Sequence, residues 1–355
     1  MSAVWGRKVR YTIFGESHGG GIGMVIDGLP AGTELDWQLI EREMARRAPG
    51  KSPLTTPRSE KDSVTICSGL YRGKTDGSPL CALIGNTDTR SADYAAEPHL
   101  FRPGHADYTA FVKTGGHNDP RGGGHFSGRL TAPLVFAGAI ARQLLAPAGI
   151  VIGAHIARIG TVEDAAFDPA AISSSLLAEL NGSSLPVLNG TAADAMRREI
   201  AAAAAAGDSV GGVVEAAATG LPAGTGEPFF DSLESTLAHL VFSIPAVKGI
   251  EFGSGFQLAA MRGSQANDSF VVNNGKVQTV SNHHGGVLGG IASGMPLVLR
   301  VAFKPTPSIA KPQDTVNAAG EAAVLNIKGR HDPCVVPRAV PVVEAAIALA
   351  VWDML

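Results

Sequence analysis

Glycine clustering is the feature that most restricts what this chain can fold into. Of its 44 glycines, 18 fall within residues 15–32, 115–128 and 285–294, three short segments that are also rich in His, Asp, Asn or Ser. Glycine adopts positive φ freely and lets a backbone approach a ligand closely, so these clusters predict tight loops that face a ligand. Gly and Pro together stay below the ~25–30% typical of low-complexity chains, which argues against disorder, and the lack of a three-residue period argues against collagen.

The charge pattern narrows the class of partner. Lys and Arg number 29 against 32 Asp and Glu, and the net charge is −3. Without a run of like charges, the chain lacks the basic footprint expected for a nucleic acid or an anionic membrane. A small anion needs only local cations. The charge pattern thus leaves a small-molecule anionic substrate open, and we expect no nucleic acid and no membrane.

Cysteine usage and hydropathy indicate the compartment. Cys67, Cys81 and Cys334 form an odd set without CxxC spacing, which argues against a disulfide framework and a zinc site. The N-terminus lacks the apolar run of a signal peptide. The longest uncharged stretch, residues 277–299, contains Asn, two His and five Gly, so it does not read as a membrane span. We expect a cytoplasmic protein with no metal.

Apolar and β-branched runs alternate with stretches of helical periodicity. Strands are predicted at residues 8–14, 23–27, 63–67, 150–155, 210–215 and 297–303. Helices are predicted at residues 34–47 with Thr33 as N-cap, 130–145, 192–206, 232–243 with Asp231 as N-cap, and 342–354. Because no regular strand–helix alternation, repeat or long linker occurs, we expect a single α+β domain over residues 1–355.

Spacing argues against several familiar ligand motifs. Gly-Lys-Ser at 50–52 and Gly-Lys-Thr at 73–75 lack the glycine that a P-loop needs five residues earlier. The glycines at 19–23 lack the last glycine of a dinucleotide-binding fingerprint. His283 and His284 are adjacent and would point to opposite sides of an extended chain, which favours a loop over a shared metal.

The first glycine cluster surrounds Ser17 and His18 directly after a predicted strand. Flanking glycines would let a ligand approach the backbone and leave the imidazole free to meet it. A tight turn with a surface histidine explains this segment equally well, so both interpretations stay open on this segment alone.

The second cluster and the segment before it alternate cations, imidazoles and exposed amides, with Arg102, His105, His125 and Arg129 among them. This mixture is typical of an oxyanion or phosphate site, and it leads into a helix near Leu130 whose N-terminus favours an anion. A purely structural loop would not need so many histidines, so we favour a functional site.

The C-terminal third contains Arg330, His331 and Asp332 in sequence. A fixed cation beside a titratable pair suits a site that binds an anion while a proton moves. An isolated triplet of this kind is more often a salt-bridged turn.

Taken together, these segments resemble the chorismate synthase family over nearly the whole chain and in the right order. The matching motifs are GESHG at 15–19, RRxPG at 46–50, NTDTRSADY at 86–94, RPGHADYT at 102–109, RGGG at 121–124, AVKG at 246–249, GGVLGGI at 285–291, KPTPSI at 304–309 and GRHDPCVVPRAVPVVEA at 329–345.

The resemblance implies a reaction, a cofactor and an architecture. Members of the family convert 5-enolpyruvylshikimate 3-phosphate into chorismate and phosphate by a 1,4-anti elimination. They require reduced FMN although no net redox change occurs. They are homotetramers whose helices pack between antiparallel sheets in a β-α-β sandwich.

The same resemblance assigns roles to residues of this chain. His18 matches the histidine that assists phosphate departure, His105 the one that protonates the reduced flavin, and Asp332 an aspartate near flavin N5. The positions implied to bind substrate are Ser17, Arg47, Arg102, Ser127, Arg129 and Arg330. The positions implied to bind flavin are His125, Phe126, Ser127, Ala246, Gly289, Lys304, Pro305, Thr306, Pro307, Ser308 and Arg330.

Several departures from the family pattern fall beside these positions. The family usually reads GRSSARET where this chain has GHFSGRLT at residues 124–131, so an arginine, a serine and a glutamate are missing. Pro53 replaces a second arginine after RRxPG, with Lys51 nearby. Pro245 replaces an asparagine, which removes a side-chain amide and a backbone donor.

Three hypotheses follow from these departures. In the first, the chain is a working chorismate synthase in which His125 or Lys51 replaces the lost positive charge. In the second, it is a paralogue that acts on a related cyclohexene carboxylate in specialised metabolism, because a less anionic substrate needs fewer cations. In the third, it is a non-catalytic flavin-binding homologue, although the retained histidines and Asp332 argue against this.

Overall fold

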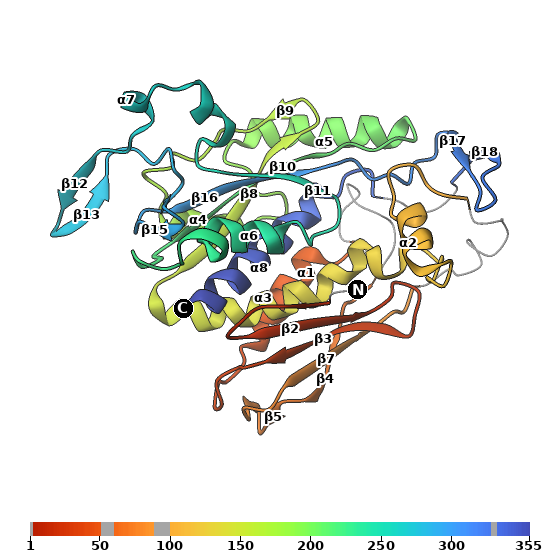
Figure 1. Ribbon diagram of the computed structural model, residues 1–355, viewed down its shortest axis with the longest axis horizontal. Helices are drawn as coiled ribbons and strands as arrows, with labels where there is room; N and C mark the ends of the chain where they lie inside the picture. The colour runs from red at the N-terminus through yellow and green to blue at the C-terminus, as the bar shows by residue number, and fades with distance from the viewer. Residues whose placement is uncertain (1–2, 51–59, 89–99, 328–331) are drawn as a thin grey trace.

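Two five-stranded antiparallel sheets enclose a layer of helices, as Figure 1 shows. This arrangement is seen in a computed structural model that describes residues 3–50, 60–88, 100–327 and 332–355. The architecture confirms the predicted α+β class with helices packed between antiparallel sheets.

The first sheet has the strand order β1-β2-β3-β7-β4. Its strands are β1 (Val4–Trp5), β2 (Arg10–Gly15), β3 (Gly21–Asp27), β7 (Leu80–Gly85) and β4 (Val64–Ser68). Side chains alternate between the two faces of a strand, and Ile22, Met24 and Ile26 of β3 are all nearly fully buried. This sheet therefore turns one apolar face towards the helices.

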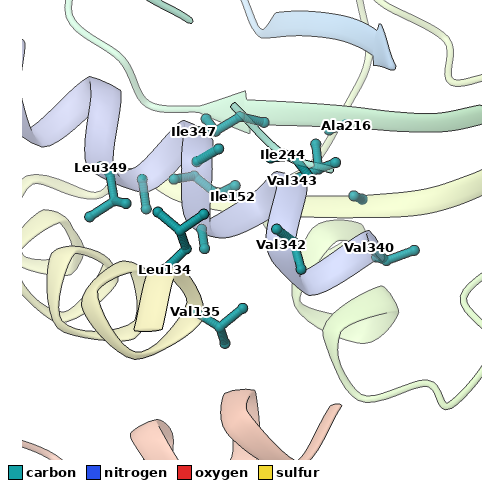
Figure 2. Packing of buried hydrophobic residues seen from close by; sticks show 14 of the residues in the cluster. Leu134, Val135, Ile152, Ala216, Ile244, Val340, Val342, Val343, Ile347 and Leu349 are labelled. Atoms are coloured by element: carbon teal, nitrogen blue, oxygen red, sulfur yellow. The ribbon is translucent and has the colours of Figure 1, made fainter. Parts of the chain in front are cut away.

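The second sheet has the order β11-β16-β10-β8-β9. Its strands are β11 (Val247–Phe252), β16 (Leu297–Phe303), β10 (Gly212–Thr219), β8 (Val151–Ile159) and β9 (Val162–Glu163). Both faces are covered. Ile152 and Ala216 face the helix layer (Figure 2), while helix α4 (Ser174–Asn181) packs on the other face, where Leu177 lies against Gly153.

Four helices fill the space between the sheets: α1 (Trp37–Arg47), α3 (Thr131–Leu145), α6 (Leu233–Val241) and α8 (Val336–Met354). Helices α3 and α8 make the closest contact, because a Cβ on Gly138 would lie 2.3 Å from the Cβ of Ala345. Figure 2 shows Val343, Ile347 and Leu349 of α8 among the buried apolar side chains of this core.

A cluster of charged side chains lies inside this helix layer. Glu344 of α8 is fully buried and accepts hydrogen bonds from Arg46 Nη1 at 2.5 Å, Arg142 Nη1 at 3.1 Å and the backbone N of Ala154 at 3.0 Å. Glu43 also pairs with both arginines. These contacts join α1, α3, α8 and the second sheet. Removing one partner of a buried ion pair leaves the other charge uncompensated, so each contact is costly to break.

The remaining elements lie around the sandwich. The helices among them are α2 (Asp107–Thr114), α5 (Gly190–Ala205), α7 (Gly263–Ala266) and short 3-10 helices at residues 124–126, 128–130, 146–148, 229–231 and 255–260. The hairpins are β5 (Leu70–Tyr71) with β6 (Lys74–Thr75), β12 (Phe270–Asn273) with β13 (Lys276–Thr279), β14 (Val287–Leu288) with β15 (Ile291–Ala292), and β17 (Gln313–Val316) with β18 (Ala322–Leu325). The β12–β13 hairpin projects far from the sheets (Figure 1).

Two predicted N-caps are wrong. Helix α1 begins at Trp37 and is capped by Asp36, because Glu34 instead forms an isolated β-bridge with Lys74. Helix α6 is capped by Ser232, whose Oγ accepts from the backbone N of Ser235 at 3.0 Å. The carboxylate of Asp231 pairs with Arg7 at 2.9 Å.

The predicted start of the last helix is also wrong. Helix α8 begins at Val336, six residues before the predicted start, and contains Pro341 in its interior. Proline disfavours a helix interior because it cannot donate to the residue four positions earlier. Here that acceptor belongs to Pro337, in the first turn, and both prolines are buried in the core.

In the part of the chain that the structure describes, one helical stretch, Gly128–Ala148, is long and apolar enough to cross a membrane by length and composition. Two thirds of its most apolar 18-residue window is buried inside the protein, and the helix packs chiefly against α8. A buried core helix meets the same criteria, so this stretch is only weak support for a membrane span.

Candidate active site

A cavity of about 1140 Å³ opens where loops of the first sheet meet the ends of α6, β16 and α8. Most of the site residues predicted from the sequence line it. They are Ser17, His18, Arg47, Arg102, His105, His125, Phe126, Ser127, Arg129, Ala246, Lys304, Thr306, Pro307, Ser308 and Asp332. The structure thus brings together residues that lie up to 315 positions apart in the printed sequence.

Three predicted residues are not placed on this wall. Arg330 lies outside the described residues. Pro305 is exposed and is not among the residues that line the cavity. Gly289 lies in the β14–β15 turn, and its neighbour Gly290 accepts a hydrogen bond from Leu233 at the N-terminal end of α6. The cavity meets the opposite end of α6, roughly 12 Å away for a helix of this length.

The first glycine cluster holds His18 beside Ser17. The buried Ser17 Oγ lies 3.1 Å from His18 Nδ1, and the backbone N of Ser17 donates to Gly124 O at 3.1 Å. Gly122 has φ +60°, and a Cβ there would lie 2.3 Å from His18 Cε1. The second glycine cluster therefore forms the surface on which the His18 ring rests.

The RPGHADYT segment folds around Asp107. Arg102 donates from Nε at 2.6 Å and from Nη2 at 2.7 Å to the two carboxylate oxygens, and His105 Nδ1 lies 2.5 Å from one of them. Arg102 also donates to the carbonyl of Gly122. These contacts connect His105 and Arg102 to Gly122, the residue against which the His18 ring lies.

Two buried arginines share one carboxylate at another part of the wall. Arg47 donates from Nη1 to Asp62 at 2.5 Å, and Arg129 donates to the other oxygen of Asp62. Arg129 also lies 3.6 Å from Glu60. Asp62 itself has a positive φ of 52°, a backbone conformation that few residues other than glycine adopt.

Guanidinium groups are crowded at this part of the cavity wall. Burial, and then the charge of Arg338, lower the pKa of Arg47 to about 10, although Asp62 opposes the shift. Arg47 nevertheless stays protonated at neutral pH. The guanidinium groups of Arg47, Arg129 and Arg338 thus lie close together, each in contact with a carboxylate.

Asp332 is held by Arg338, a residue of α8. Arg338 Nη1 donates to Asp332 at 2.6 Å, and its Nε donates to the carbonyl of Arg47 at 3.0 Å. Arg338 thereby fixes Asp332 relative to the C-terminal end of α1.

The altered 124–131 segment keeps its histidine on the cavity wall. His125 Nδ1 lies 2.9 Å from the carbonyl oxygen of Gly15. A carbonyl only accepts, so Nδ1 carries a proton. Pro245 also lines the cavity. Pro53, and Lys51 as the expected substitute for the lost charge, lie outside the described residues.

The KPTPSI segment offers a second place for an anion. Burial, and then the nearby charge of Lys248, lower the pKa of Lys304. Within the described ranges, neither ammonium group pairs with a carboxylate, and Thr306 Oγ1 is buried without a hydrogen-bond partner. Two close cations and an unpaired hydroxyl fit a dianion such as the phosphate of FMN.

Sequence reasoning missed four residues of this wall and its support: Asp62, Asp107, Lys248 and Arg338. Asp107 and Arg338 lie inside motifs already recognised. Asp107 is two residues from His105 and five from Arg102, and Arg338 is six residues from Asp332. Those spacings were the available signal. Asp62 lies outside every motif, so the local sequence offered none.

The whole chain is similar to proteins of known class. Residues 9–355 match the family model described as chorismate synthase. The chain belongs to the chorismate synthase family. A chorismate synthase of Thermococcus kodakarensis is 48% identical over 99% of this chain and 96% of its own length. One of Porphyromonas gingivalis is 49% identical over 98% of this chain and 94% of its own length.

A solved structure supports the same conclusion. The crystal structure of a chorismate synthase aligns with a TM-score of 0.78 and 30% identity, covering 99% of this chain and 92% of that one. The family and the chorismate synthase sandwich that the motifs predicted are therefore confirmed. Each alignment covers nearly all of this chain and nearly all of the relative.

Proposed function

We propose that this chain catalyses the 1,4-anti elimination of phosphate from 5-enolpyruvylshikimate 3-phosphate, giving chorismate. The observation that carries the proposal is one cavity lined by His18, His105 and Asp332 together with a set of arginines. A substrate with a phosphate and two carboxylates needs several cations, and these side chains supply them. Near 48% identity to chorismate synthases over full length also favours this function over the paralogue.

Elimination breaks one C–H bond and one C–O bond and creates a second ring double bond. The electron pair of the C–H bond stays in the ring as part of the new diene, phosphate leaves with the pair of the C–O bond, and the ring proton passes to a base in the cavity. His18 would donate a proton to the departing phosphate or, as a cation, pair with its charge. Ser17 Oγ, 3.1 Å from Nδ1, holds the ring in a fixed orientation. Arg47, Arg102 and Arg129 would bind the anionic groups of the substrate, with Arg330 and Ser127 completing this set of proposed contacts.

Lys304, Thr306, Pro307 and Ser308 would hold the flavin, with His125, Phe126, Ser127 and Ala246 on the adjoining wall. Lys304 and Lys248 would pair with its phosphate, and Thr306 Oγ1 would gain the partner it lacks. When bound, reduced FMN would supply electron density to the leaving step and regain it, which would account for a cofactor without net redox change. His105 would hold the proton that keeps the reduced flavin neutral, and Asp332 would lie near N5.

A homotetramer fits two features of the single chain. The projecting β12–β13 hairpin exposes Phe270 at 65%, Val272 at 75% and Val277 at 65%, which is an apolar surface typical of an interface. Gly289 lies at the far end of α6 from the cavity, so its proposed flavin contact requires a neighbouring copy of the chain. We further propose a cytoplasmic location.

The decisive experiment mixes purified protein, reduced FMN and 5-enolpyruvylshikimate 3-phosphate without oxygen and follows chorismate absorbance and phosphate release. Equal appearance of both products is expected. Flavin binding without turnover would support the non-catalytic homologue. Phosphate release only from another cyclohexene carboxylate would support the paralogue.

Flavin binding has its own matched pair of variants. Lys304→Gln removes a cation from the cavity, whereas Lys311→Gln removes an exposed lysine that pairs with Asp208. We expect the first to weaken FMN binding at least about tenfold, as loss of a charge-assisted contact predicts, and the second to leave it unchanged. Equal affinities would contradict the proposed phosphate site.

A further inference from the structure

The carboxylate of Asp107 accepts hydrogen bonds from two residues with proposed roles in the reaction. It accepts from Arg102 through the backbone N at 3.0 Å, through Nε at 2.6 Å and through Nη2 at 2.7 Å. It also lies 2.5 Å from His105 Nδ1. Neither the motifs nor the family comparison assigns a role to this residue.

Local structure explains why one carboxylate reaches both partners. Asp107 is the first residue of α2, and its N-cap, Ala106, has no side chain to cap the helix. The helix N-terminus favours a negative charge at this position. Gly104, with φ +71°, turns the chain so that Arg102 and His105 face back towards the start of α2.

The protonation state of Asp107 follows from its contacts. Burial alone would raise its pKa, but hydrogen bonds from Arg102 and His105, together with their charges, hold the pKa well below its ordinary value. Asp107 is therefore ionised at neutral pH, and an ionised carboxylate only accepts hydrogen bonds. His105 Nδ1 must then be the donor.

The second ring nitrogen of His105 is free of this constraint. Among the described residues, Nε2 has no hydrogen-bond partner, and His105 lines the cavity. With the proton fixed on Nδ1, the neutral ring keeps a lone pair on Nε2 that can accept a proton and return it. Without the contact to Asp107, the ring would spend part of its time as the other tautomer, in which Nε2 carries the proton and has no lone pair.

We infer that Asp107 is a positioning residue for the proposed reaction, which fixes the tautomer of His105 and the guanidinium of Arg102. The expected effect on kcat rests on the proposed function, whereas the expected tautomer of His105 does not depend on it. Arg102 in turn donates to Gly122 O, and Gly122 supports His18. Asp107 thus orients both proposed catalytic histidines while touching only one of them.

The test compares two aspartate-to-asparagine variants. Asp107→Asn keeps the size of the side chain and removes the charge. Asp119→Asn is the matched control, because Asp119 accepts from Arg121 N at 3.0 Å, Nε at 2.9 Å and Nη2 at 2.7 Å in the same region and, within the described residues, forms no hydrogen bond with a histidine. Neither member of this control pair is among the residues that line the cavity.

With chorismate formation as the assay, we expect Asp107→Asn to lower kcat about 100-fold, since orienting carboxylates beside catalytic histidines have effects up to ~10⁴. KM should rise severalfold because Arg102 loses its ionic partner. Asp119→Asn should stay within about threefold of wild type in both constants. Comparable losses in the two variants would mean that Asp107 only packs the loop, and would overturn the inference.

A second measurement needs no turnover. Solid-state NMR of protein labelled with ring ¹⁵N histidine, with the His105 signals assigned by their loss in His105→Gln, reports which nitrogen carries the proton. Wild type should show a protonated Nδ1, and Asp107→Asn should move the proton to Nε2. A bare Nδ1 in wild type overturns the inference even if the variant fails to fold. Inactive wild type would overturn the proposed function while leaving this result decisive.

Discussion

Gly122 lies against the imidazole of His18, so close that a Cβ at position 122 would lie 2.3 Å from Cε1 and 2.4 Å from Nδ1. The same Cβ would lie 3.1 Å from Ser17 Oγ. The two residues are 104 positions apart, in different glycine clusters. Contact between the clusters, more than the composition of either one, shapes this part of the cavity.

Gly122→Ala should therefore displace His18 and lower kcat at least about 100-fold, since displacements near 1 Å at a reacting group can have that effect. Gly115→Ala is the control. It has nearly the same φ, +63°, but a Cβ there meets nothing within 4 Å. Steady-state kinetics and circular dichroism of both variants check the expectation, and equal losses would assign the effect to backbone strain.

Glu344→Gln should destabilise the protein by about 3–5 kcal/mol, because it leaves Arg46 and Arg142 with only Glu43 in a buried environment. The exposed Arg158–Glu163 pair provides the comparison, and Glu163→Gln should change stability by less than about 1 kcal/mol. Urea unfolding measures both. A small effect at Glu344 would mean that water reaches the cluster.

His155 should make stability depend on pH. It is fully buried between Asp164 at 3.1 Å and Glu215 at 2.8 Å. Burial alone would lower its pKa, but these two partners raise it above its ordinary value. A raised folded-state pKa gives stability that is fully present below about pH 6.5 and is lost as pH rises through the folded-state value.

The measurement is the urea midpoint of wild type and His155→Gln between about pH 5.5 and 9. The advantage of wild type over the variant should shrink as pH rises. An advantage that stays constant across this range would show that His155 does not change its charge there.

The three cysteines should react with iodoacetamide in a fixed order. Cys67 is exposed and should react first. Burial, and then the neighbouring Cys67, raise the pKa of Cys81, so it should follow more slowly. Burial raises the pKa of Cys334 to about 12, so it should react only after unfolding. Peptide mass spectrometry over time checks the order, and early labelling of Cys334 would contradict the packing of α8.

Strand and helix positions could largely be predicted from periodicity, because each apolar run faces the common core. The strand at residues 297–303 is confirmed at both ends. Errors occur where distant contacts decide the local structure. Glu34 pairs with Lys74 instead of entering α1, and Pro341 is accepted inside α8 because the surrounding core holds that helix.

The site could be predicted as a set of residues but not as a network. Motif positions identified most of the cavity wall. The contact between Asp62 and the two arginines could not be predicted, since it joins segments 15 and 67 residues apart with no shared pattern. Arg102 and Asp107 are close in sequence, yet a carboxylate with four donors is recognised only when the turn at Gly104 is seen.

The helices between the sheets have a consequence for how the molecule loses its structure. Each sheet buries its inner face only against this shared layer, and the contact of Gly138 with Ala345 leaves no room for α3 and α8 to separate. Neither half of the sandwich could keep a dry interior if the other detached. The residues that form the cavity should therefore persist or disappear together with both sheets, in a single cooperative transition.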